Sequence, residues 1–331
     1  MNNKKIIISL VILGVIASLG FIAWRSTTTT TPIRVAKYYW PGEFWVEIAD
    51  SKGWFKEAGL NVELVDANPD YFKSLQDTVD GKIDTNEFVL FDFVKYLGQG
   101  ADLVVVLAGD RSLGADGIVA KKGITSVNDL RGKRVGVPNG TYLHFILDTL
   151  LEREGIHHSE VTDVNIQAEQ AAEEFAKGTL DAVVTYEPIL TQAIEKGNGH
   201  KIFDTSQLPG VSVGVYAFRQ DFVKNRPEDV QKFVAVWRKT ADFIKTNPDE
   251  AYGIIAQIYG AKKEDVAAFA KQDQILDWRD NKTAFSYAAG LDSFHGLARN
   301  VESYLQKEGL LKQNIDSTQY LNARFIRALD R

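Results

Sequence analysis

Cysteine is absent from the 331 residues, and its absence excludes several kinds of chemistry at once. The chain can form no disulfide, no thiolate nucleophile, no cysteine metal site and no lipid anchor on cysteine. Histidine is scarce, with five residues and no H-x-x-x-H or H-E-x-x-H pair, which argues against a zinc enzyme. No G-x-S-x-G motif occurs, and the Gly-Lys-Arg at 132–134 lacks the rest of a phosphate-binding loop.

Positive charge is also in short supply. The formal net charge is −6 and the isoelectric point is near 5.5. Nucleic acid is therefore excluded as a partner, because phosphate binding needs a basic face. With 45% hydrophobic residues, the chain is long enough for one large domain or two medium ones, each with its own core.

One long uncharged run is present, at the N-terminus. Lys4 and Lys5 precede the segment from Ile6 to Trp24, which as a helix would be about 28 Å long, close to the thickness of a bilayer core. The positive flank belongs on the cytoplasmic side, so the remainder is expected outside the cytoplasm, in the periplasm. We favour an uncleaved membrane anchor over a cleaved signal peptide, followed by a polar spacer that extends to Thr31.

Beyond Pro32, strand-like and helix-like segments alternate in two halves with the same plan. Helix-stopping glycines stand 22 residues apart in the first half, at Gly59 and Gly81, and 23 apart in the second, at Gly155 and Gly178. This parallel indicates two lobes of similar α/β build. The expected strands are 33–37, 61–65, 134–137, 161–166 and 180–184, and the expected helices are 44–58, 70–79, 142–154 and 169–177. The C-terminal third reads as helices at 227–246, 248–259, 263–271 and 291–308, with packing as their expected role.

Ligands of parallel sheets lie beyond the carboxyl ends of the strands, so three turns matter. The first, Tyr38–Trp45, holds five aromatic rings, of which Phe44 and Trp45 fall in the following helix and are expected to pack. The second is Pro138–Tyr142, where Thr141 is a plausible N-cap and the helix start would favour an anion. The third is Tyr186–Pro188. Capping and packing remain the alternative explanation for the second and third turns.

Arg111 lies where the chain would pass from the first lobe to the second. Its guanidinium has the geometry to bind a carboxylate or sulfonate, and it could equally pair with Asp110 or Asp116 as a structural contact. The glycines at 109, 114 and 117 suit a hinge, and residues 208–214 form a natural second crossing.

Three segments carry a family resemblance: Gly114–Ala120, Ser126–Thr141 ("SVNDLRGKRVGVPNGT") and Ala171–Pro188 ("AAEEFAKGTLDAVVTYEP"). They resemble the substrate-binding proteins of ABC importers, in the group that binds nitrate, taurine, alkyl sulfonates and thiamine-pyrimidine precursors. Two departures from the group's pattern bear on ligand identity. Ser212 and Gly214 stand where relatives often carry Asp, and the cysteine-rich motif of the pyrimidine-synthesising relatives is missing.

The resemblance implies a type II periplasmic binding fold, with two Rossmann-like α/β lobes joined by two crossovers. Lobe 1 would comprise 32–113 plus 215–331 and lobe 2 would comprise 114–214. It also implies which turns line the cleft between the lobes. With Arg111 added to the residues of these turns, ten ligand-binding residues are predicted: Tyr39, Trp40, Glu43, Asn86, Arg111, Gly140, Thr141, Tyr142, Tyr186 and Glu187.

The leading hypothesis is a monomeric extracytoplasmic receptor that delivers a small polar solute to an ABC permease and its ATPase, without cofactor or metal. Arg111 and the Thr141 helix end favour an anion such as a sulfonate, whereas Glu43 and Glu187 beside aromatic rings favour an amine or aminopyrimidine. A taurine-like zwitterion would satisfy both. The alternatives are an enzyme on the same fold acting on a pyrimidine-type substrate, with His144 as the best catalytic candidate, and a membrane-tethered sensory module.

Overall fold

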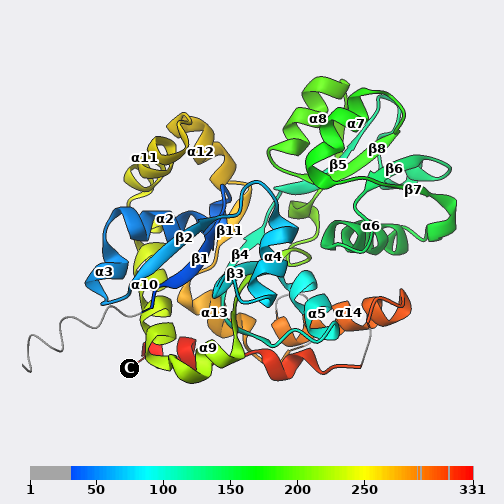
Figure 1. Ribbon diagram of the computed structural model, residues 1–331. Helices are drawn as coiled ribbons and strands as arrows, with labels where there is room; N and C mark the ends of the chain where they lie inside the picture. The colour runs from blue at the N-terminus through cyan, green and yellow to red at the C-terminus, as the bar shows by residue number, and fades with distance from the viewer. Residues whose placement is uncertain (1–30, 289, 291–292, 312–313, 331) are drawn as a thin grey trace, which may run out of the picture.

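The computed structural model describes residues 31–288, 290, 293–311 and 314–330. It contains two mixed sheets, which lie in two separate parts of the ribbon (Figure 1). The first sheet has the order β11-β4-β10-β3-β1-β2, and the second has the order β7-β6-β8-β5-β9. The predicted N-terminal membrane segment, residues 6–24, lies outside the described residues.

The five strands expected from the sequence correspond to β1, β2, β6, β7 and β8, each within two residues of its expected bounds, and the other strands had no expected bounds. The strands of the first sheet are β1 (Ile33–Lys37), β2 (Val62–Asp66), β3 (Thr85–Val89), β4 (Leu103–Ser112), β10 (Val213–Arg219) and β11 (Asp273–Ile275). The strands of the second sheet are β5 (Asp116–Ala120), β6 (Arg134–Val137), β7 (Thr162–Asn165), β8 (Ala182–Tyr186) and β9 (His200–Asp204).

The two sheets repeat one topology. In the first, β1 lies between β3 and β2 and pairs parallel with both; in the second, β6 lies between β8 and β7 and again pairs parallel with both. The long strands that lead between the sheets then add antiparallel partners, β10 to β3 and β5 to β8. The two-lobe α/β fold predicted from the glycine spacing is therefore confirmed. The lobe boundaries stay a proposal; the chain passes between the sheets at 113–115 and 205–212.

The helices cover the faces of these sheets. They are α2 (Phe44–Ser51), α3 (Trp54–Glu57), α4 (Tyr71–Val79), α5 (Leu90–Gly98), α6 (Tyr142–Arg153), α7 (Ala171–Ala176), α8 (Ile189–Gly197), α9 (Gln220–Asn225), α10 (Pro227–Thr246), α11 (Pro248–Tyr259), α12 (Lys263–Ala270), α13 (Trp278–Ala284), α14 (Phe294–Lys307) and α15 (Arg324–Arg327). The single helix expected at 44–58 is wrong. The chain breaks at Lys52 and Gly53, where Gly53 takes a φ of 71° that ends α2 and starts α3.

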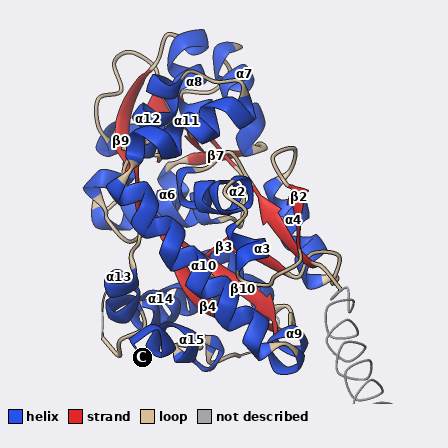
Figure 2. Ribbon diagram, turned by 90° about the vertical axis from the view of Figure 1, so that its left-hand side faces the viewer, coloured by secondary structure: helices blue, strands red, loops and turns tan. Residues whose placement is uncertain are grey.

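The core of the first lobe forms around Trp45. Its indole Nε1 donates to the hydroxyl of Tyr216 at 2.8 Å, and its ring packs edge-on against Phe233 with centroids 5.0 Å apart. Phe233 belongs to α10, which lies across β10 (Figure 2). Phe44 and Trp45 are fully buried, as the sequence predicts. Complete burial of such large side chains stabilises this lobe by about 2–3 kcal/mol each.

The two lobes also meet at a seam formed by α5, α6 and α14, which lie close together in Figure 1. Phe91 of α5 stacks on Phe145 of α6 with centroids 5.3 Å apart, and Tyr304 of α14 packs edge-on against Phe145 at 5.0 Å. Lys95 Nζ donates to the carbonyl oxygen of Gly140 at 2.6 Å. These contacts fix the lobes relative to each other beside the crossovers.

Candidate functional site

A cavity of about 330 Å³ lies between the two sheets, at the carboxyl ends of their parallel strands. Segments that follow β1, β2, β6, β7 and β8 all contribute side chains to it. Its walls are Tyr38, Tyr39, Trp40, Glu43, Ala67, Asn68, Tyr71, Glu87, Val89, Asp110, Ser112, Tyr142, Glu169, Tyr186, Glu187, Pro188, Ile189, Ser212 and Gly214. The position agrees with the rule that ligands of α/β sheets bind beyond the strand ends.

Aromatic rings form most of one wall, and the helical hairpin α11–α12 holds them in place. Tyr39 packs on Tyr259 of α11 at a centroid distance of 4.7 Å, and both Tyr39 and Trp40 pack on Phe269 of α12 at 5.6 Å. Trp40 also faces Tyr186 from the other lobe, edge-on, at 6.5 Å. The rings are thus fixed before any ligand enters, which lowers the entropic cost of binding.

The ring of Tyr38 is positioned by the buried side chain of Asn86. The Tyr38 hydroxyl donates to Asn86 Oδ1 at 2.9 Å, and Asn86 Nδ2 donates to Ser74 Oγ at 3.1 Å and to Thr78 Oγ1 at 3.2 Å. Every side-chain polar atom of Asn86 is therefore engaged within the fold. Asn86 itself does not line the cavity; it orients Tyr38, which does.

Three carboxyl groups form the floor of the cavity. Glu43 stands at the end of the turn of 3-10 helix Pro41–Glu43 (η1), Glu87 on β3 and Asp110 on β4, and they are 1%, 6% and 3% exposed. Trp40 Nε1 donates to Asp110 Oδ2, and the backbone N–H of Gly214 donates to Asp110 Oδ1 at 2.9 Å. By contrast, no donor reaches either carboxyl oxygen of Glu43 or Oε1 of Glu87 with regular hydrogen-bond geometry, and the two carboxyl groups lie close to each other and to Tyr216.

Burial raises the pKa of all three carboxyl groups. For Glu87 the negative charge of Asp110 adds to burial, and its pKa lies well above the ordinary value, as does that of Glu43. For Asp110 the hydrogen bonds with Asp273, Trp40 and Gly214 offset part of the effect of burial, and its pKa is still raised. Desolvation disfavours the charged form of each group unless a positive charge lies nearby.

The lobe 2 side of the cavity is fixed by internal hydrogen bonds. Tyr186 donates to Glu169 Oε1 at 2.7 Å, and Tyr142 donates to Asp116 Oδ1 at 2.9 Å. Glu187 accepts from Thr191, from its hydroxyl at 2.9 Å and from its backbone N–H at 3.2 Å, so it caps the start of α8. Glu187 still lines the cavity while serving this structural role.

The ten residues predicted from the sequence divide into two sets. The structure brings six of them together in the cavity wall: Tyr39, Trp40, Glu43, Tyr142, Tyr186 and Glu187. It places the other four outside that wall: Asn86, Arg111, Gly140 and Thr141. Thr141 is the N-cap residue of α6, but its hydroxyl donates backwards to Pro138 O at 2.7 Å and accepts no capping hydrogen bond from the helix. The ligand role of these four residues remains a prediction.

Sequence reasoning missed Tyr38, Tyr71, Glu87 and Asp110. Two of these misses are errors of one residue along a strand, because Glu87 follows Asn86 and Asp110 precedes Arg111. Successive side chains of a strand point to opposite faces, so Asp110 and Arg111 cannot both face the cavity. Asp110, directly after the apolar run 103–109, was detectable on that ground, whereas Glu87 follows Asp84, Thr85 and Asn86 and gave no such signal.

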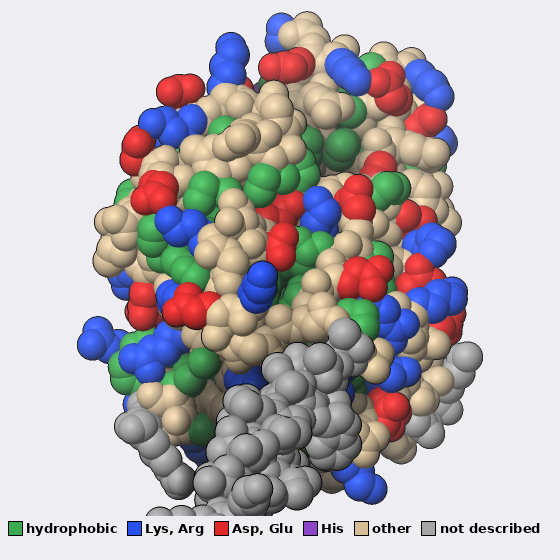
Figure 3. Space-filling view, turned by 60° about the vertical axis from the view of Figure 1, so that its left-hand side comes forward, with side chains coloured by type: hydrophobic (Ala, Val, Ile, Leu, Met, Phe, Trp, Pro, Cys, Tyr) green, Lys and Arg blue, Asp and Glu red, His purple; other side chains and the backbone are tan. Residues whose placement is uncertain are grey.

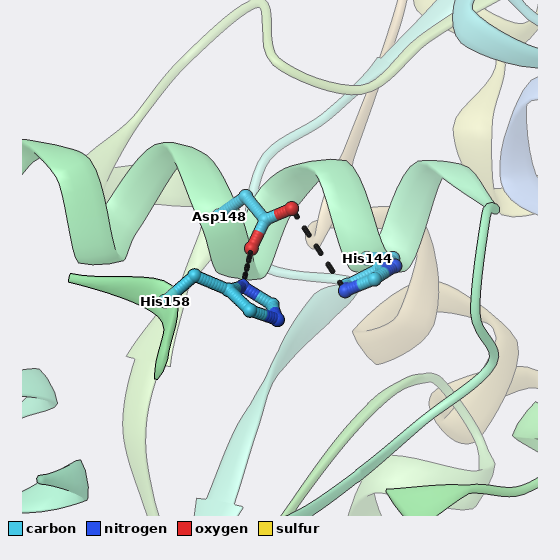
Figure 4. Close-up of side chains that lie close together, drawn as sticks. All are labelled: His144, Asp148 and His158. Carbon is cyan, nitrogen blue, oxygen red and sulfur yellow. Dashed lines mark hydrogen bonds and ion pairs between the residues drawn. The ribbon is translucent and has the colours of Figure 1, made fainter. Parts of the chain in front are cut away.

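His144, the catalytic candidate from the sequence, lies away from the cavity in a cluster with Asp148 and His158 (Figure 4). Among the described residues, this is the one group whose possible metal-ligating atoms all lie within 4.8 Å of one another. His144 Nε2 is 2.8 Å from Asp163 Oδ2, and His158 Nδ1 is 2.6 Å from Asp148 Oδ1.

The tautomer of His144 decides whether this cluster is a metal site or a hydrogen-bonded network. The backbone N–H of Gly140 donates to His144 Nδ1 at 3.1 Å, so the neutral ring carries its proton on Nε2 and donates it to Asp163. Binding a metal through Nε2 would move that proton to Nδ1, where it would oppose the Gly140 N–H. The cluster is therefore best described as a hydrogen-bonded network that ties α6 to β7.

The molecular exterior differs from the cavity in charge. On the face shown in Figure 3, Lys and Arg side chains are interspersed with Asp and Glu. The cavity wall has Glu43, Glu87, Asp110, Glu169 and Glu187, and no Lys, Arg or His of the described residues belongs to it. Carboxyl groups are thus gathered in the cavity without basic side chains, whereas both signs of charge occur on the face shown in Figure 3.

Comparison with known proteins gives consistent results. A family model described as NMT1/THI5 like matches residues 45–251. A Bacillus subtilis protein named for aliphatic sulfonate binding is 26% identical over 238 residues, covering 70% of this chain and 71% of its own. The taurine-binding periplasmic protein of Escherichia coli is 22% identical over 324 residues, covering 94% and 97%.

Solved structures share the fold. The periplasmic aliphatic sulphonate binding protein SsuA of Escherichia coli superposes with a TM-score of 0.71 at 16% identity, over 88% of this chain and 98% of its own. The desulfurization enzyme DSZB superposes with a TM-score of 0.67 at 16% identity, over 91% and 99%. The type II periplasmic binding fold is therefore found in binding proteins and in an enzyme. No helix among the described residues has the length and apolar character to cross a membrane.

Proposed function

We propose, from the premise that this chain belongs to the NMT1/THI5-like family, that it is an extracytoplasmic receptor that closes two lobes on a small polar solute. The observation that carries the proposal is the cavity between the two sheets, where preorganised rings and buried carboxyl groups meet. Its volume is at the lower end for small-molecule sites and suits a ligand with a single ring or a short chain.

The relatives support a role in import. Proteins named for binding sulfonates and taurine, one of them periplasmic, match most of the chain. A receptor of this kind would deliver its solute to an ABC permease and ATPase and act in the periplasm. The segment 6–24 would tether it to the inner membrane unless it is cleaved. Sulfonates, taurine-like zwitterions and aminopyrimidines are the candidate ligands from which the chemistry of the cavity must select.

The side chains that line the cavity favour a receptor over an enzyme. A general base or nucleophile must reach the reacting atom, and His144 lies outside the wall with both ring nitrogens already hydrogen-bonded. The aromatic rings and carboxyl groups of the wall suit recognition. We therefore propose binding without turnover, even though DSZB is an enzyme with the same fold.

Thermal-shift screening of the full chain in mild detergent tests the proposal. A ligand that binds the folded state raises the melting temperature in a concentration-dependent way. We expect at least one small polar solute at millimolar concentration to do so and to be recovered unchanged. If the wild-type protein chemically converts a solute and a His144→Ala variant does not, the result would support the alternative hypothesis of an enzyme.

A further inference from the structure

We propose that the cavity is built for an organic cation, a protonated amine or amidinium group carried on a flat ring, and that it discriminates against free sulfonates and carboxylates. The inference rests on the proposed receptor function and specifies its ligand. It differs from what the names of the sulfonate- and taurine-binding relatives would suggest. Three independent features of the cavity carry it: the sign of its charge, its unpartnered acceptors and the shape of its floor.

The first feature is charge. Five carboxyl-bearing residues belong to the wall and, among the described residues, no basic side chain does. Arg111, the guanidinium that the sequence offered for an anion, does not line the cavity. A sulfonate placed here would approach buried carboxyl groups without an opposing positive charge, which is unfavourable in a poorly solvated site.

The second feature is the set of acceptors without donors. Glu43 Oε1 and Oε2 and Glu87 Oε1 are buried, and no donor reaches them with regular hydrogen-bond geometry, although Tyr216 and the two carboxyl groups lie close to one another. A buried polar atom that lacks a partner destabilises the state that contains it, so a ligand that supplies N–H donors gains affinity there. Ammonium and amidinium groups consist of such donors, whereas sulfonate and carboxylate anions offer acceptors alone.

The third feature shows that these carboxyl groups are placed by the backbone. A Cβ on Gly42 or Gly214 would collide with the carboxyl group of Asp110, and a Cβ on Gly109 would collide with Glu87 Oε1. Gly214 lies directly opposite Asp110 in the pairing of β10 with β4. Three glycines on separate segments therefore make the space in which the carboxyl groups lie.

The remainder of the wall suits the body of such a ligand. Tyr39, Trp40 and Tyr186 present ring faces and edges from both lobes, and an organic cation gains from contact with such rings. A bare metal ion is a poor occupant. In the described part of the chain, the group with metal-like convergence is the histidine cluster, and the three floor carboxyl groups do not meet that criterion.

The experiment compares four probes of similar size on the full chain in mild detergent at pH 7.5: benzamidine, benzylamine, benzenesulfonate and benzyl alcohol. Isothermal titration and thermal shift are the readouts. We expect the two cations to bind at least tenfold more tightly than benzyl alcohol, and benzenesulfonate to bind more weakly than benzyl alcohol. Equal or tighter binding of benzenesulfonate would overturn the inference while leaving the receptor in place.

Two variants locate the interaction. Glu43→Gln and Glu87→Gln keep the shape of the side chain but cannot become a carboxylate when a cation binds, and each is expected to weaken benzamidine binding at least tenfold. Glu173→Gln, at an exposed carboxylate of α7 outside the cavity, is the matched control and should change nothing. Unchanged benzamidine affinity in both floor variants would contradict the inference. If neither these probes nor any solute of the screen binds, the receptor function itself fails.

Discussion

The indole Nε1 of Trp40 donates a hydrogen bond to Asp110 Oδ2 at 2.5 Å. This bond joins the aromatic turn after β1 to the carboxyl floor on β4, across 70 residues of sequence. The same ring packs edge-on against Phe269, with centroids 5.6 Å apart, and edge-on against Tyr186 at 6.5 Å. This hydrogen bond thus anchors the centre of the aromatic turn Tyr38–Trp45.

Replacing Trp40 separates its hydrogen bond to Asp110 from the contact of its ring with the ligand. Trp40→Phe keeps a ring but removes the donor to Asp110 Oδ2, so the free energy of unfolding should fall by about 1–2 kcal/mol while the hydrogen bond from the N–H of Gly214 remains. Trp40→Ala removes the ring as well and should abolish benzamidine binding and the accompanying change in tryptophan fluorescence. Urea unfolding and titration measure the two effects. If Trp40→Ala binds normally but unfolds far more easily, the ring serves the core and not the ligand.

The raised pKa of Asp116 predicts how stability depends on pH. Burial raises the pKa of Asp116 to about 6, and Tyr142, Ser112 and Ser212 reduce that effect through hydrogen bonds. The folded protein therefore holds this proton more tightly than the unfolded chain does. Its contribution to stability is complete below about pH 4 and is lost as the pH rises to about 6, with a total change of up to about 3 kcal/mol.

Asp116→Asn removes this titration, so its unfolding free energy should fall less steeply than that of the wild type between pH 4 and pH 6. Glu43, Glu87, Asp110 and Asp273 keep a residual slope in both proteins, because burial raises the pKa of each. Asp50→Asn, at an exposed carboxylate, should leave the profile unchanged. Parallel profiles for wild type and Asp116→Asn would refute the assignment.

A pair of glycine substitutions tests whether the floor is shaped by the backbone. Gly214→Ala places a methyl group against Asp110 and Glu87, so it should lower the unfolding free energy by about 1–3 kcal/mol and abolish benzamidine binding. Gly253→Ala, on α11 with no atom near the added methyl, should raise the unfolding free energy by about 0.5–1 kcal/mol. Urea titration of both variants measures this difference. An increase in the unfolding free energy for Gly214→Ala as well as for Gly253→Ala would show that the floor tolerates a side chain.

The architecture could be predicted well because helix-ending glycines and the spacing of apolar residues depend on neighbouring residues in the sequence. Gly59, Gly81, Gly155 and Gly178 all take a left-handed backbone, and the segments between them form the same strand and helix order in both lobes. The site was predicted less completely, because contacts such as that of Trp40 with Asp110 join distant segments. The family resemblance suggested Asn86, and the position at the crossover suggested Arg111, whereas the side chains of β3 and β4 that line the cavity are those of Glu87 and Asp110.

The seam of α5, α6 and α14 gives a way to alter closure without touching the cavity. Tyr304 of α14 donates to Asp148 Oδ2 of α6 at 2.5 Å, so this bond joins the two lobes in the arrangement described. Tyr304→Phe removes the bond and keeps the ring packed on Phe145, which should cost the closed arrangement about 1 kcal/mol.

Benzamidine affinity should then fall by about fivefold, because a smaller fraction of the protein is in the binding-competent state. Small-angle scattering without ligand should show a larger radius of gyration than for wild type. Tyr287→Phe, at a hydroxyl on an 82% exposed side chain, is the control that should alter neither. An unchanged affinity with an increased radius would mean that the seam sets the lobe arrangement but that ligand binding does not depend on it.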